Sequence, residues 1–141
     1  MIHMNDKIKN YIKMERNQGS YFQRNDGNSI LEALAILFDD HGSSANWFIE
    51  ELLDPNSRGI SGEWMRLKFK GDKVVVTPTE LMYPREKPED PEDYAIEIDR
   101  DVLLRLANEW QNLVRQKAPV IFIVQRDDEL FVTDTLPEGM E

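Results

Sequence analysis

The segment that most constrains the fold runs from Ser29 to Phe38. Its apolar residues would occupy almost every side of a helix, and Ser29 and Glu32 have the S-x-x-E spacing of a capping box at its start. A helix that is apolar on all sides must be covered by other elements. The segment therefore predicts a buried central helix around which the rest of the chain packs.

Three further segments predict helices. They are residues 4–15, 45–53 and 99–117. The helix at 45–53 would form a hairpin with the first helix. Its core-facing residues are expected to be Trp47, Phe48, Leu52 and Leu53. The helix at 99–117 has the clearest pattern, because its apolar residues form one stripe and Asp99 lies where a cap is favoured.

Five segments predict strands, because apolar and β-branched side chains alternate or run together in them. They are residues 63–70, 74–77, 94–98, 120–124 and 130–133. In the first of these, Trp64 shares a face with Arg66, Lys68 and Lys70. We expect helices to cover that face and to bury Trp64, although an exposed Trp64 would suit a protein interface.

The order of these elements, α-α-α-β-β-β-α-β-β, predicts the fold class. Hairpins dominate, so we expect an α+β fold with one antiparallel sheet of about five strands packed by helices. A chain of 141 residues is in the usual range of one core, and residues 1–141 are expected to form a single domain. Residues 83–93 combine three prolines with seven charges and predict an exposed acidic loop. We expect residues 135–141 to form a flexible tail.

Few residues suggest catalysis or metal binding. The chain has no cysteine, which excludes disulfides, thiolate zinc sites and a cysteine nucleophile, and fits the cytoplasm. His3 and His41 lie apart from each other, and no nucleotide-binding or hydrolase motif occurs. We expect no enzymatic activity, cofactor or metal, with a small enzyme of unknown reaction as the third alternative. No apolar run or export signal indicates a membrane partner.

The charge of the chain is negative and unevenly placed. A formal net charge of −10 argues against a nucleic-acid partner, which would require a basic footprint. Residues 25–57 contain seven acids and no Lys or Arg. Asp39, Asp40 and Asp54 would close helices at their carboxyl ends, where the helix dipole disfavours carboxylates.

Two readings of this acidic cluster remain open. Solvated helix ends with screened charges would explain it without a function. A binding surface would explain it too, because complementary charge accelerates and orients the encounter with a basic partner. On the second reading, the residues expected to contact a partner are Asp39, Asp40, Glu50, Glu51 and Asp54.

Several segments together resemble a known family. They are Tyr21-Phe22, the helical hairpin with Trp47, the strand at 96–99, the helix with Glu109-Trp110 and the closing hairpin at 120–132. This pattern is similar to the small acidic α+β immunity proteins of bacterial contact-dependent growth inhibition and related polymorphic toxin systems. The resemblance implies a cytoplasmic inhibitor that binds a cognate toxin domain, often a basic nuclease, through carboxylates that mimic phosphate. The alternative is a general adaptor or oligomerisation module that uses the sheet face around Trp64 or an exposed strand edge.

Overall fold

The protein folds into helices that lie between two antiparallel sheets. The computed structural model describes residues 11–17, 20–23, 29–38, 46–62, 65–78 and 95–139. Within these ranges the strands form two sheets, in the orders β2-β1-β7-β8 and β3-β4-β5-β6. The prediction of one five-stranded sheet, with the element order α-α-α-β-β-β-α-β-β, is therefore wrong.

The first sheet joins the two ends of the described chain. It contains β1 (Tyr11–Asn17), β2 (Ser20–Gln23), β7 (Val120–Arg126) and β8 (Glu129–Thr133). Strand β1 lies between β2 and β7, and Tyr11 pairs with Val124. Between β7 and β8, Asp127 and Asp128 both have positive φ angles, as the tight turns of hairpins require.

Strand β1 overturns the helix that was predicted at residues 4–15. Residues 4–10 lie outside the described ranges, but from Tyr11 onward the chain is extended. Ile12 and Met14 are buried and Lys13 between them is exposed, which is the alternation of a strand with one covered face. Burial against α1 and β7 decides the conformation of a segment whose spacing also fits a helix.

The second sheet contains the strands that the sequence predicted in the middle of the chain, with one addition. Its members are β3 (Gly59–Ser61), β4 (Met65–Lys70), β5 (Lys73–Pro78) and β6 (Ile96–Asp99). The short strand β3 was not predicted. On β4, Met65, Leu67 and Phe69 are buried, whereas Arg66, Lys68 and Lys70 are exposed. The expectation that helices cover this basic face is therefore wrong for these three residues. Trp64 lies outside the described ranges.

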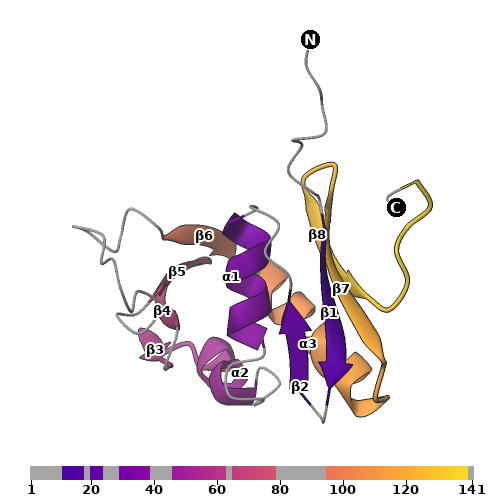
Figure 1. The fold of residues 1–141 in the computed structure, drawn as a ribbon. Coiled ribbons are helices and arrows are strands. Elements are labelled where there is room, and N and C mark those ends of the chain that lie inside the picture. The colour runs from indigo at the N-terminus through magenta and orange to yellow at the C-terminus, as the bar shows by residue number, and fades with distance from the viewer. Residues whose placement is uncertain are drawn as a thin grey trace, which may run out of the picture.

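Helices lie between the two sheets, and one of them lies at the end of this space beside β3 (Figure 1). They are α1 (Ser29–Phe38), α2 (Asn46–Leu53) and α3 (Arg100–Arg115). Helix α1 contacts β1 and β7 of the first sheet and β4 and β6 of the second, and α3 likewise contacts β8, β5 and β6. Phe38 of α1 packs on Trp110 of α3 with ring centroids 5.8 Å apart. The predicted central helix and the helices expected at 45–53 and 99–117 are confirmed.

The start of α3 differs in detail from the sequence prediction. Asp99 occupies the cap position, but its side chain makes no hydrogen bond to the helix. Its carboxylate instead accepts a hydrogen bond from the Lys73 ammonium of the neighbouring strand. That hydrogen bond and the negative charge of Asp99 raise the pKa of Lys73 above its ordinary value. The predicted loop at residues 83–93 lies outside the described ranges.

Gly59, at the start of β3, provides a test of how closely β3 packs on β4. Its φ angle is +150°, and a Cβ atom there would lie 2.2 Å from the carbonyl oxygen of Leu67. We expect Gly59→Ala to lower the free energy of unfolding by about 2 kcal/mol. The new Cβ atom would push away the backbone of Leu67, and alanine is strained at this φ angle. Urea denaturation measures the change. Gly71→Asn is the control, since Gly71 has a φ of +61° and open space around it, and it should cost less than about 0.5 kcal/mol.

Candidate functional site

The structure describes three of the five residues that were predicted to bind a partner. Asp39 and Asp40 lie outside the described ranges. Glu50 and Glu51 lie in the last turn of α2, and Asp54 follows it directly. Glu50 and Asp54 are exposed, and Glu51 is half-buried.

Two of these carboxylates have local structural roles. Glu51 Oε2 accepts a hydrogen bond of 2.6 Å from Ser57 Oγ. Asp54 Oδ1 accepts one of 2.9 Å from the backbone N–H of Asn56, as in an Asx turn. These bonds fix the chain where it leaves α2. Glu51 and Asp54 are thus explained in part by the shape of the loop that follows the helix.

A basic residue from elsewhere in the sequence lies at this helix end. Arg100, the first residue of α3, donates from Nε to the carbonyl oxygen of Leu52 at 2.9 Å and from Nη2 to that of Asp54 at 3.1 Å. Its guanidinium also lies over the Phe69 ring, 4.6 Å from the centroid. A cation at the carboxyl end of a helix is favourable because it binds free carbonyl groups and opposes the helix dipole. Sequence reasoning missed this contact, since the two positions are 46 residues apart.

An exposed leucine lies among the acidic residues. Leu53 is 60% exposed and is the large apolar side chain that the described part of the chain leaves in solvent. It follows Glu50 by three positions, so these two side chains are neighbours on the helix surface, and the exposed Asp54 comes directly after it in the chain. The prediction that Leu53 faces the core is wrong. Phe48 and Leu52 do face the core, as predicted. We call Glu50, Leu53 and Asp54 the α2 surface.

A pocket adjoins the α2 surface. It has a volume of about 640 Å³ and lies between the end of α2, the β4–β5 turn and the start of α3. Leu53 and Pro55 supply apolar wall, and Arg58 and Arg100 supply positive charge. Most of its lining is polar, so the site suits a polar group of a partner beside a small apolar wall.

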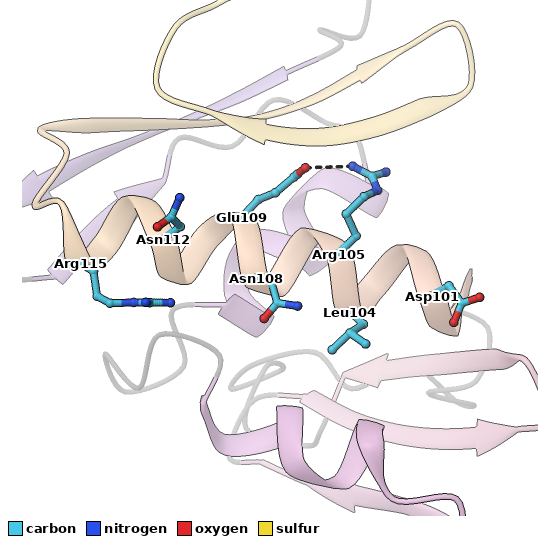
Figure 2. A pocket seen from close by; sticks show the side chains of 7 residues that line it. All are labelled: Asp101, Leu104, Arg105, Asn108, Glu109, Asn112 and Arg115. Carbon is cyan, nitrogen blue, oxygen red and sulfur yellow. Dashed lines mark hydrogen bonds and ion pairs between the residues drawn. The ribbon is translucent and has the colours of Figure 1, made fainter.

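A second hollow runs along the outer side of α3 (Figure 2). Its volume is about 700 Å³, and all of its lining residues come from this helix, among them Leu104, Asn108, Asn112 and Arg115. None of these is a nucleophile held by a base. In the described part of the chain no group of three or more His, Asp and Glu residues could hold a metal ion. His3 and His41 lie outside the described ranges.

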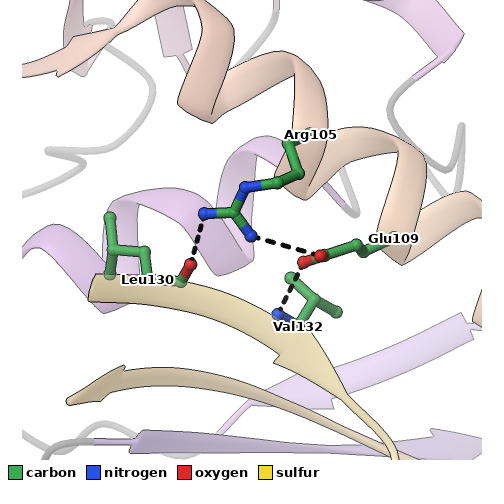
Figure 3. A network of polar contacts seen from close by, with 4 residues as sticks. All are labelled: Arg105, Glu109, Leu130 and Val132. Carbon is green, nitrogen blue, oxygen red and sulfur yellow. Dashed lines mark hydrogen bonds and ion pairs between the residues drawn. The ribbon is translucent and has the colours of Figure 1, made fainter.

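Two further side chains that line this hollow bind the edge of a sheet (Figure 3). Arg105 Nη2 donates to the carbonyl oxygen of Leu130 at 2.7 Å, and the backbone N–H of Val132 donates to Glu109 Oε1 at 3.0 Å. Arg105 Nη1 also donates to Glu109 Oε2 at 3.1 Å. Because β8 is an edge strand, its outward backbone groups would otherwise be open to pairing with another chain. The network therefore closes that edge.

Glu109 is expected to stabilise the fold through this network. Glu109→Ala removes the acceptor of the Val132 N–H and the partner of Arg105, so we expect the free energy of unfolding to fall by about 1–2 kcal/mol. Urea denaturation measures the fall. Asn108→Ala, at an exposed position on the same helix, is the control and should change stability by less than about 0.5 kcal/mol. Equal effects of the two variants would contradict the role of the network.

Arg100 is expected to fix the end of α2. Arg100→Met keeps part of the aliphatic stem but loses the hydrogen bonds to the carbonyl oxygens of Leu52, Asp54 and Gly71, and we expect about 1–2 kcal/mol of destabilisation. Amide hydrogen exchange should quicken most at residues 50–57. Arg126→Met, at an exposed position on β7, is the matched control and should leave both measurements unchanged. A uniform rise in exchange over the whole chain would show that Arg100 stabilises the core instead of the helix end.

Comparison of the chain with models of known protein families, with curated proteins and with solved structures found no match. Among the described residues, no helix has the length and apolar character needed to cross a membrane.

Proposed function

We propose that this protein is a protein-binding inhibitor of the immunity-protein type, which neutralises a cognate toxin domain in the cytoplasm. The observation that supports a binding role most directly is the α2 surface, where Leu53 is 60% exposed and two exposed carboxylates, Glu50 and Asp54, lie beside it. The proposed partner presents an apolar pocket or patch surrounded by basic residues.

An apolar residue with charged neighbours suits protein recognition. Burying a leucine side chain fully stabilises a complex by about 1.5–3 kcal/mol. The carboxylates around it add less to affinity, but they speed association with a basic partner and orient it. Contacts of this kind, with an apolar centre and a polar rim, are typical of protein interfaces.

A general adaptor without a toxin partner is the second candidate. The observation that favours it is the exposed outer face of the second sheet, which carries Arg66, Lys68 and Lys70. A partner that uses this face alone would be indifferent to changes in the α2 surface.

The proposal is tested with the toxin domain itself. The place to look for it is the gene immediately upstream, where the immunity hypothesis expects a large secreted protein with a toxin domain at its carboxyl end. Expressed alone in a bacterial host, this domain should stop growth, and co-expression of this chain should restore it. Leu53→Asp should abolish the rescue and weaken binding about 10- to 150-fold by calorimetry, because it removes the apolar contact.

The role of charge is tested separately. Glu50→Lys should weaken binding about fivefold and slow association at low salt. Glu97→Lys makes the same change of charge at an exposed position on β6 and is the matched control, so it should leave rescue and affinity unchanged. A toxin domain that this chain neither binds at micromolar concentration nor neutralises would refute the proposal.

A further inference from the structure

The outer face of the second sheet carries a stripe of cations on β4. Alternation along this strand sends Met65, Leu67 and Phe69 into the core, and it sends Arg66, Lys68 and Lys70 into solvent. Helices α1 and α3 pack against the second sheet on the side of the buried residues. The cations therefore lie on a sheet face that the described part of the chain does not cover. We call these three residues the β4 stripe.

Neighbouring strands do not neutralise the β4 stripe. On β5, the residues directly opposite Arg66, Lys68 and Lys70 are Thr77, Val75 and Lys73. On β3, Ser61 and Gly59 lie opposite Arg66 and Lys68. Among the described residues, none of the three cations forms an ion pair, whereas Lys73 pairs with Asp99.

Within the described strands, the stripe has no counter-charge at the positions directly beside it. Lys70 lies opposite Lys73, and the carboxylate of Asp99 is engaged by Lys73 and not by Lys70. A chain with 27 acidic and 17 basic residues has ample carboxylates to place beside three cations, yet none lies opposite them. The stripe therefore fits a role in binding better than a role in stability.

We propose that the β4 stripe binds a short acidic segment of a partner protein, held in an extended conformation with carboxylates at alternate positions. Alternate residues of a strand lie about 6.8 Å apart, so the stripe is about 14 Å long. An extended acidic segment has the same spacing between every second side chain. Three carboxylates of such a segment can each meet one cation.

The dimensions of the stripe disfavour nucleic acid as its occupant. Double-stranded DNA carries one charge per about 1.7 Å, so a 14 Å length would bring about eight phosphate charges to three cations. A segment with a few carboxylates matches the charge without an excess.

This surface is separate from the α2 surface and has the opposite charge. The proposed inhibitor role uses Glu50, Leu53 and Asp54 to meet a basic partner. The β4 stripe adds an acidic segment of a partner protein as a second ligand. The two surfaces can be tested independently, because they share no residue.

The experiment uses two synthetic peptides and nuclear magnetic resonance of the labelled full chain. One peptide alternates three glutamates with threonines, and the other has the same composition with the glutamates in one block. The alternating peptide should shift the amide signals of residues 66–70, 73–77 and 59–61. Raising the salt from about 20 to 300 mM should weaken binding severalfold, because exposed ion pairs are screened.

Variants then assign the binding to the stripe. Lys68→Gln should weaken binding of the alternating peptide about 1.4- to 5-fold, and Arg66→Gln/Lys68→Gln/Lys70→Gln should remove it. Arg115→Gln/Lys117→Gln/Arg126→Gln removes three exposed cations elsewhere and should bind as the parent does. The amide spectrum of each variant confirms its fold.

Four outcomes would overturn the proposal. They are absence of shifts at millimolar peptide, shifts that lie outside the second sheet, equal binding of the block peptide, and equal binding by the triple variant of the stripe. Tighter binding of a single-stranded oligonucleotide with the same charge would assign the stripe to nucleic acid instead. Loss of toxin binding in Leu53→Asp tests the inhibitor role alone and leaves this result unaffected.

Discussion

The burial of α1 on all sides is the constraint on which the rest of the structure depends. Leu31, Leu34, Leu37 and Phe38 are each fully buried, and the half-buried residues of this helix also pack on the core. A single sheet covers one side of a helix, so an all-apolar helix needs further cover on its other sides. The chain provides that cover with a sheet on either side and with α3, whose Trp110 packs on Phe38. Two sheets follow from this requirement.

This arrangement also decides where binding surfaces can form. Because α1 and α3 occupy the space between the sheets, the residues left for partners lie on outer faces and at element ends. At one edge, Arg105 and Glu109 bind the backbone of β8 and close it to other strands. The α2 surface and the outer face of the second sheet lie in positions that no described element covers. Stability and recognition are thus assigned to different parts of the molecule.

Sequence reasoning succeeded where a pattern was long or contained within one segment. The apolar stripe of α3 fits only a helix, and the alternation of buried and exposed residues along β4 fits only a strand. Both elements were predicted. It failed at β1, because Tyr11, Ile12 and Glu15 fit helical spacing while Ile12 and Met14 fit a strand. The pairing of β1 with β7 decides between them, and that partner lies more than a hundred residues away. The division of the strands into two sheets was missed for the same reason, since local patterns do not reveal which strands pair.

Charge along the sequence also differs from charge in space. The stretch at 25–57 contains no basic residue, yet Arg100 binds the carbonyl oxygens at the end of α2. Glu51 and Asp54 partly serve the loop that follows. The acidic cluster is therefore less anomalous than the sequence indicates, and its value for recognition depends on the exposed Leu53 beside it. An exposed apolar residue adds binding energy, whereas solvated carboxylates mainly set the rate and orientation of encounter, so Leu53 carries more of the functional inference than the net charge does.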